Sequence, residues 1–167
     1  MAEDAAANAA LIERFYTAFA RRDSETMGAC YTPDARFSDA VFRDLRGEEV
    51  PAMWRMLCER GTDLEIGHSD VATEGARGSA NWWADYTFSA TGRSVHNEIS
   101  ASFRFENGLI AEHEDSFSLW RWSRQALGPV GMLGGWSPPV QNKIRAQARE
   151  GLVAFIASEP PRQPAGA

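Results

Sequence analysis

The 167-residue sequence predicts a single α+β domain in which helices pack on one face of a curved antiparallel sheet. Three observations favour this fold class. Apolar residues recur at helical spacing near the N-terminus. The period then changes to alternation over residues 62–120, in segments separated by short turn-like breaks. A further helical pattern follows near the C-terminus.

The first helix is expected over residues 4–22, because one stripe of its surface is apolar. The stripe consists of Leu11, Ile12, Phe15, Tyr16 and Phe19. The basic pair "RR" ends this helix, where cations interact favourably with the helix dipole. Asp23 or Ser24 can then cap a short second helix that runs to Tyr31.

The middle of the chain predicts one strand, one helix and then an antiparallel meander. Residues 32–34, "TPD", are expected to form a turn, and residues 35–42 a strand. A third helix is predicted over residues 46–61, with Pro51 near its first turn, where a missing N–H is tolerated. The strands of the meander are expected over residues 62–75, 79–90, 93–106 and 109–120. Their breaks, "EGARGS", "ATGRS" and "ENG", contain glycine and suit hairpins.

After the last strand, a short helix is expected to lead into a glycine-rich loop over residues 128–135, which we interpret as a mobile flap. A last helix is predicted over residues 139–157, either closing a pocket mouth or packing on a partner subunit. Its apolar stripe consists of Val140, Ile144, Ala148, Leu152 and Phe155. The chain is therefore expected to divide into a core, residues 1–122, a helical extension, residues 123–157, and a disordered tail, residues 158–167.

The composition argues against several functional classes. With 17 basic and 23 acidic residues the net charge is −6, and no long basic block is present, so we expect no nucleic-acid partner. No apolar run approaches about 18 residues, so we expect no membrane partner. Cys30 and Cys58 form no C-x-x-C pair, and the first ten residues do not have the pattern of a signal peptide. These features predict a cytoplasmic protein.

The alternation along the predicted strands identifies polar groups that face the core, because successive side chains point to opposite faces of a sheet. Along residues 93–106, the apolar parity contains a single polar residue, Asn97. Along residues 79–90, the apolar parity consists of Trp82, Ala84, Tyr86 and Phe88. Asp85 has the opposite parity and is expected outside the core.

Two further segments place acids on the inner face. In "GLIAEHEDSFSLW", residues 108–120, His113 and Asp115 share the apolar parity, and Asp39 shares a parity with its apolar neighbours in "ARFSDAVF". Tyr16 and Tyr86 are candidate hydroxyl donors beside them. The expected aromatic neighbours are Phe15, Trp54, Trp82, Phe88 and Phe117. A buried carboxylate is costly unless it is paired or protonated, so these groups form either a satisfied core network or a site with chemistry.

The sequence predicts neither a metal site nor a cofactor. His68, His96 and His113 show no H-x-x-x-H or H-E-x-x-H spacing. The segment "GPVGMLGG" lacks the G-x-G-x-x-G dinucleotide pattern, and no phosphate-binding loop is present.

Four segments resemble the nuclear transport factor 2-like superfamily: "LIERFYTAFARRD", "CYTPDARFSD", "LRGEEVPAMW" and "FRFENGLIAEHED". Within it, the chain is similar to SnoaL-like and ketosteroid-isomerase-like bacterial proteins, over about residues 8–122. The resemblance implies a cone, in which a bent antiparallel sheet wraps on helices around a pocket. It also implies a dimer, often formed through the outer face of the sheet.

The resemblance implies roles for individual residues as well. The general-base Asp of ketosteroid isomerases aligns with Asp39, whereas their oxyanion-hole Tyr aligns with Phe15 and their protonated Asp with Ala101. The acid/base Asp of SnoaL-like polyketide cyclases aligns with Asp115, as does the last-strand Asp of limonene-epoxide-hydrolase-like enzymes. The remaining Arg and Asp of those hydrolases have no matching residue here.

Two functions therefore stay open. In the first, a cofactor-independent enzyme with an apolar, aromatic-lined pocket uses Asp115 as general acid or base, assisted by His113 and by Asp39. Isomerisation, aldol-type cyclisation and epoxide opening all fit such chemistry. In the second, the same fold binds a hydrophobic ligand or dimerises without catalysis, and His113 and Asp115 are a satisfied buried pair. Both imply a hydrophobic small-molecule ligand and a homodimer.

Overall fold

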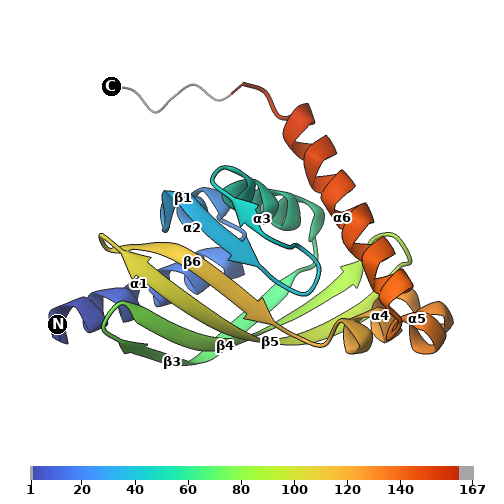
Figure 1. Cartoon of the computed structure of the whole chain (residues 1–167), viewed down its shortest axis with the longest axis horizontal. Helices are drawn as coiled ribbons and strands as arrows, with labels where there is room; N and C mark the ends of the chain where they lie inside the picture. Colours follow the sequence, from blue (N-terminus) through green and yellow to red (C-terminus); the bar gives the residue numbers. More distant parts are fainter. Residues whose placement is uncertain (1, 162–167) are drawn as a thin grey trace.

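A computed structural model describes residues 2–161, with side chains from residue 4 onward. The helices are α1 (Ala2–Ala20), α2 (Ser24–Ala29), α3 (Glu49–Arg60), α4 (Leu119–Leu127), α5 (Pro129–Gly134) and α6 (Pro138–Ser158). The strands are β1 (Tyr31–Ser38), β2 (Leu45–Arg46), β3 (Glu65–Glu74), β4 (Arg77–Phe88), β5 (Arg93–Glu106) and β6 (Leu109–Ser116). They form one sheet in the order β2-β1-β6-β5-β4-β3 (Figure 1). The predicted α+β fold is confirmed.

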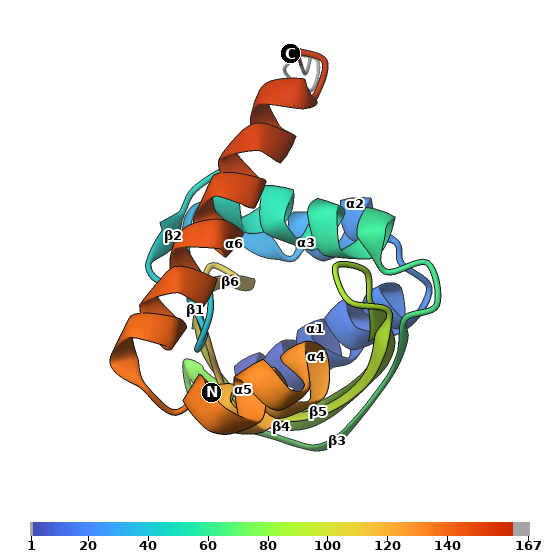
Figure 2. The ribbon, with the colours of Figure 1, turned by 90° about the vertical axis from the view of Figure 1, so that its right-hand side faces the viewer.

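The sheet is a meander with a short addition at one edge. Strands β3 to β6 pair antiparallel with their neighbours in sequence, and β1 joins β6 as a parallel pair. Gly92 (φ 68°) and Gly108 (φ 76°) adopt the left-handed backbone that the tight hairpin connections require. Figure 2 shows that the sheet bends strongly, with α1 along its concave side and α3 on the opposite side of the cone.

The start of β1 differs from the sequence prediction. Residues 32–34, expected as a turn, lie inside the strand. The pairing of β1 with β6 shifts register between Tyr31 and Arg36, where Pro33 has no N–H to offer a neighbouring strand. The turn-forming residues are thus absorbed as an irregularity of the strand, which leaves Tyr31 paired at its first position.

The segment after β6 also differs from expectation. The strand ends at Ser116, and Ser118 caps α4 by accepting a hydrogen bond from the Arg121 N–H. Residues 128–135, expected as a mobile flap, contain the helix α5. This helix packs tightly on α4, because a Cβ atom at Gly131 would lie 1.9 Å from the Ser123 carbonyl oxygen. The glycines here permit close helix packing.

The main core lies between α1, α3 and the concave face of the sheet. Burial alternates along β5 as predicted, with Val95, Asn97, Ile99, Ala101, Phe103 and Phe105 inside. A smaller apolar cluster around Trp122 joins α4 to the end of the sheet. The core therefore encloses the polar residues that the strand parity singled out.

Helix α6 crosses one end of the cone, where it packs apolar side chains on the core and also makes polar contacts. Arg145 donates to the Ala40 carbonyl oxygen, Arg149 pairs with Glu49, and Arg55 pairs with Glu159. The predicted disordered tail begins inside this helix, and its residues 162–167 lie outside the described part of the chain. No helix within residues 2–161 is long and apolar enough to cross a membrane.

Candidate active site

A cavity of about 450 Å³ lies inside the cone, between the concave face of the sheet and α3, with α4 and α6 at its open end. Seven of its lining residues are Phe or Trp: Phe19, Phe42, Trp54, Trp82, Phe88, Phe117 and Trp122. Cavities of this size and character suit small apolar molecules. The polar groups that reach this space decide what chemistry it supports.

Asp115 is one of two carboxylates in the cavity wall. It lies on β6 directly opposite Ala101 of β5 and is only 4% exposed. Its Oδ1 atom accepts a hydrogen bond from Trp82 Nε1 (3.3 Å) and lies 2.9 Å from His113 Nε2. Its Oδ2 atom has no hydrogen-bond partner among the described residues. One oxygen is therefore held by the protein while the other stays free.

His113 lies behind Asp115 and does not line the cavity. It is 2% exposed, and its Nδ1 atom lies 2.7 Å from the Tyr31 hydroxyl oxygen. Trp54 Nε1 donates to the same oxygen over 3.0 Å. A continuous hydrogen-bonded chain thus connects Trp54, Tyr31, His113 and Asp115 through the core to the cavity wall.

The sequence did not predict that Tyr31 and Trp54 belong to this series of hydrogen bonds. Trp54 was expected only as an aromatic pocket residue, and Tyr31 only as the end of a helix. The parallel pairing of β1 with β6 places Tyr31 beside His113, although 82 positions separate them in the sequence. A Tyr at the first position of a buried strand is a weak signal, because most such residues are core.

Asp39 is the second carboxylate in the cavity wall. It follows the end of β1, and its Oδ1 atom accepts hydrogen bonds from the N–H groups of Val41 (2.7 Å) and Phe42 (2.6 Å). The turn, and not strand parity, therefore orients this side chain. The pKa of Asp39 is raised to about 7, chiefly by burial; the Asp115 charge contributes to this rise, and the two N–H donors oppose it.

Asn97 and Tyr86 add neutral polar groups to the same cavity. The Asn97 side chain has no hydrogen-bond partner among the described residues. The Tyr86 hydroxyl accepts from Trp122 Nε1 (2.7 Å) and keeps its own proton for another acceptor. Burial is the main cause of its raised pKa, to which the nearby Asp39 charge adds. Both groups are placed to orient a bound molecule.

The remaining predicted pocket residues, Phe15 and Tyr16 of α1, lie behind the cavity wall. Phe15 packs edge-on against the His113 ring, with 5.6 Å between centroids. The Tyr16 hydroxyl is buried without a hydrogen-bond partner among the described residues. Its pKa is raised well above 10, by burial first and then by the Asp115 charge. Both residues contribute to the environment of Asp115 without reaching the cavity.

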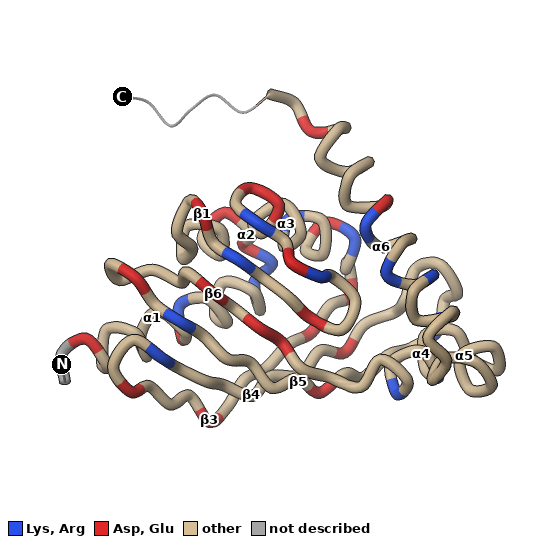
Figure 3. Tube along the Cα trace, viewed as in Figure 1, with Lys and Arg blue, Asp and Glu red and all other residues tan. Residues whose placement is uncertain are grey.

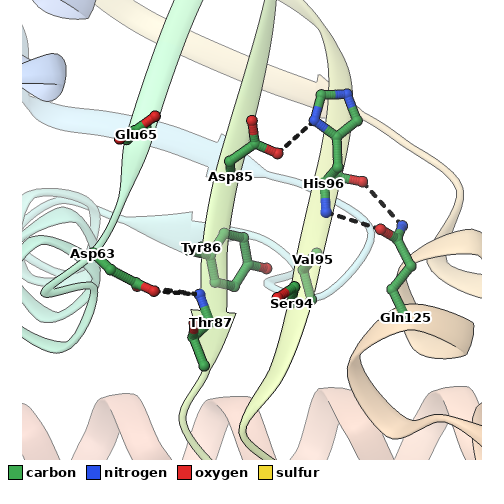
Figure 4. Close-up of a pocket in the computed structure, with 9 residues that line it drawn as sticks. All are labelled: Asp63, Glu65, Asp85, Tyr86, Thr87, Ser94, Val95, His96 and Gln125. Carbon is green, nitrogen blue, oxygen red and sulfur yellow. Dashed lines mark hydrogen bonds and ion pairs between the residues drawn. The ribbon is translucent and has the colours of Figure 1, made fainter.

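A second depression, of about 420 Å³, lies on the outer face of the sheet (Figure 4). Asp85 pairs there with His96 at 2.6 Å. Asp63 accepts a hydrogen bond from the Thr87 N–H in the same depression (Figure 4). The carboxylate beside His96 raises the pKa of this imidazole. The depression is shallow, and these polar groups already have partners. Among the described residues, no group of three or more His, Cys, Asp or Glu could hold a metal ion.

Comparison with known proteins gives one family match and many similar structures. A family model described as SnoaL-like domain matches residues 12–113. A protein assigned as a SnoaL-like polyketide cyclase, from Jannaschia sp. CCS1, superposes with a TM-score of 0.67 and 16% identity, over 75% of this chain and 94% of that chain. A search of curated proteins found no match.

Two more solved structures have the same fold. An epoxide hydrolase of the LEH-like type from M. tuberculosis has a TM-score of 0.63 and 18% identity, over 77% of this chain and 96% of that chain. TsrD from Streptomyces laurentii has a TM-score of 0.62 and 26% identity, over 72% of this chain and 95% of that chain. The cone is thus shared across proteins with different names and little common sequence.

Proposed function

The chain belongs to the SnoaL-like domain family, and we propose that it is an enzyme that moves protons on an apolar small molecule held in the interior cavity. The Asp115 carboxylate is the observation that carries this proposal. Its Oδ1 atom is held by Trp82 and His113, whereas its Oδ2 atom is unpaired in the wall of the cavity. A carboxylate fixed at one oxygen and free at the other is arranged for proton transfer.

Asp115 acts as the general base in this proposal. Two N–H donors at Oδ1 fix the orientation of the carboxylate. His113 supports Asp115 from behind, because the imidazole lies outside the cavity and is confined by aromatic rings. The proton taken from a substrate would arrive at Oδ2.

Asp39 acts as the general acid from another part of the cavity wall. Its pKa of about 7 leaves a substantial fraction of the carboxyl protonated at neutral pH. Two carboxyl groups in one cavity with different environments can divide the acid and base roles. A reaction that needs protonated Asp39 should slow as the pH rises through about 7.

The substrate is proposed to be an apolar molecule with a few polar atoms. Aliphatic and aromatic side chains line much of the cavity, and Asn97 and Tyr86 can orient polar atoms of the substrate. Isomerisation, aldol-type cyclisation and epoxide opening all need one acid and one base across such a molecule. A cyclase assignment and an epoxide hydrolase among the similar structures support this range of reactions.

One observation favours a second candidate function, the binding of a hydrophobic ligand without catalysis. The two positions that align with the oxyanion donors of ketosteroid isomerases hold Phe15 and Ala101. Ala101 lies directly opposite Asp115, so the place of that donor is occupied by a methyl group. A binding protein would need no such donors.

A homodimer in the cytoplasm is part of the same proposal. The outer face of the sheet and α5 both offer exposed surface for a second copy. Cys30 and Cys58 are free and buried, which agrees with a reducing compartment. Both statements stay predictions.

Asp115→Asn tests the catalytic role. The amide oxygen still accepts hydrogen bonds at the position of Oδ1, so the fold should be retained, whereas the base is lost. Against a substrate found by mass spectrometry of co-purifying ligands or by screening, kcat should fall about 10²–10⁴-fold. Glu114→Gln is the matched control, because Glu114 is the exposed neighbour on the same strand.

Two outcomes would contradict this role. Unchanged turnover in Asp115→Asn would exclude Asp115 as the base. Ligand binding without any turnover, in the wild type as in the variant, would favour the binding function. Circular dichroism and thermal unfolding of both variants show whether the fold is intact.

A further inference from the structure

Tyr31 occupies a position that controls the proton on His113. Its hydroxyl oxygen lies 2.7 Å from His113 Nδ1 and 3.0 Å from Trp54 Nε1, and its side chain is buried. The Tyr31 and His113 rings are nearly parallel, with 6.1 Å between centroids. Tyr31 does not line the cavity, so it can act on a bound molecule only through the residues that it contacts.

The hydrogen bonds in this chain have one consistent direction. The indole N–H of Trp54 can only donate, so the Tyr31 oxygen accepts from it. The Asp115 carboxylate can only accept when it is ionised, so His113 Nε2 carries a proton and donates to it. The single Tyr31 hydroxyl proton then has one remaining acceptor, which is the unprotonated Nδ1 atom of His113.

The alternative arrangement leaves a buried group unsatisfied. If His113 Nδ1 carried a proton, the Tyr31 oxygen would accept from both sides. Its own proton would then have no acceptor in the core, and an unsatisfied buried donor is costly. Tyr31 therefore disfavours both the Nδ1–H tautomer and the doubly protonated imidazolium.

We infer that Tyr31 is a positioning residue that holds His113 neutral, in the tautomer protonated at Nε2, so that Asp115 stays an ionised base with Oδ2 as its accepting atom. This inference rests on the proposed role of Asp115. It assigns no contact with substrate to Tyr31. The chemical effect is that each hydrogen bond of this series is donated in the direction of Asp115 Oδ1.

The surroundings of His113 add nothing that could replace Tyr31. Its ring is enclosed by Phe103 and Phe37, with centroids 4.4 and 5.0 Å away, and by Trp54 and Phe15. The ring is thereby kept from turning over to exchange its two nitrogens. Three other titratable groups lie near these hydrogen-bonded residues. They are Tyr16 of α1 beside Asp115, Cys30 beside Tyr31, and Asp39 across the cavity.

Long-range ¹H–¹⁵N correlation spectra of the full-length, ¹⁵N-histidine-labelled protein test this inference. In the wild type at neutral pH, His113 should show one protonated nitrogen, Nε2, and one unprotonated nitrogen, Nδ1. In Tyr31→Phe, the Nδ1 signal should move at the same pH, because this nitrogen loses the hydrogen bond that the Tyr31 hydroxyl donates to it. Tyr16→Phe is the matched control and should leave the His113 signals unchanged.

Tyr16 is a suitable control because it is also a buried Tyr near Asp115, but its hydroxyl has no partner among the described residues. A wild-type spectrum with protonated Nδ1 would overturn the inference without any variant, so it can be tested even if Tyr31→Phe does not fold. Identical spectra for folded Tyr31→Phe and wild type would overturn it as well.

A kinetic readout separates this inference from the proposed function. With a substrate that Asp115→Asn fails to turn over, Tyr31→Phe should lower kcat about tenfold and leave KM unchanged, as expected for a group outside the cavity. Unchanged kcat in Tyr31→Phe would overturn the positioning role alone. Unchanged turnover in Asp115→Asn would instead overturn the proposed function, while the spectra would still report the state of His113.

Discussion

The Asp39 carboxyl group links the candidate site to the stability of the protein. Its pKa is raised from 3.8 to about 7, mainly because burial disfavours the charged form. Folding therefore takes up a proton between these two pH values. The stabilising contribution of neutral Asp39 is complete below about pH 4 and is lost as the pH rises through about 7.

Asp39→Asn should remove the loss of stability at high pH, because the amide stays neutral at every pH. Its oxygen can still accept hydrogen bonds from the Val41 and Phe42 N–H groups. We predict that the variant is more stable than the wild type at pH 8, by on the order of 2 kcal/mol, and that the difference shrinks at pH 5. Urea unfolding at both pH values measures it.

Asp34→Asn is the control for this prediction, because Asp34 is exposed on β1, the strand that leads to Asp39. It should have little effect on the pH dependence of unfolding. A wild type and an Asp39→Asn variant with parallel pH profiles would show that Asp39 is charged in the folded protein over this whole range.

At the scale of a single element, helix α6 contributes to the wall of the cavity. Four of its residues line the open end: Ile144, Gln147, Ala148 and Gly151. Only Leu152 is fully buried in this helix, and Ala148 and Phe155 pack partly buried against the same core. Its polar attachments are Arg145 to Ala40, Arg149 to Glu49 and the ion pair of Arg55 with Glu159 just beyond its end. Polar attachments of this kind contribute modestly at a surface. We expect α6 to open more readily than the sheet.

Leu152→Ala should therefore loosen α6 selectively. The substitution truncates the most deeply buried side chain of the helix, at a cost of about 2–5 kcal/mol for a buried Leu. Hydrogen exchange followed by mass spectrometry should show faster exchange over residues 138–158, with β5 unchanged. Val153→Ala, at the exposed neighbouring position, should have no such effect. Equal acceleration in β5 would mean that α6 unfolds only together with the sheet.

The whole molecule exposes an apolar surface around α5. It consists of Val130, Met132, Leu133 and Trp136. Figure 3 shows that Asp and Glu positions are spread along the strands of the sheet, whereas from Phe117 to Arg149 the sequence contains no acidic residue. The outer face of the sheet offers one large exposed apolar side chain, Trp83. The surface around α5 is therefore better suited than the sheet face to form a dimer through apolar contacts.

We predict a homodimer that includes α5 in its interface. Leu133 is 78% exposed, and Leu133→Glu should convert the dimer to a monomer in size-exclusion chromatography with light scattering. Trp83→Ser, at a side chain that is 37% exposed on the sheet, should leave the dimer intact. The reverse pattern would place the interface on the sheet, as the family resemblance implied. A monomeric wild type would contradict the dimer itself.

The order and type of most elements, and the inward direction of the site groups on β5 and β6, followed from the sequence alone. Helical spacing and strict alternation are properties of neighbouring residues, so they can be read without knowing which elements meet. Parity placed Asn97, His113 and Asp115 inside and Asp85 outside, as the structure shows. The Asp39 side chain was also expected to point inward, but the turn after β1, and not strand parity, orients it.

Only the tertiary structure decided how these groups are connected. The parallel pairing of β1 with β6 brings Tyr31 to His113, and α3 brings Trp54 to Tyr31. Packing of α5 on α4 likewise made a helix of a glycine-rich segment that sequence alone indicated as a loop. Periodicity reports which side of an element faces inward. The partner that a side chain meets there depends on contacts between residues far apart in sequence, which local patterns do not encode.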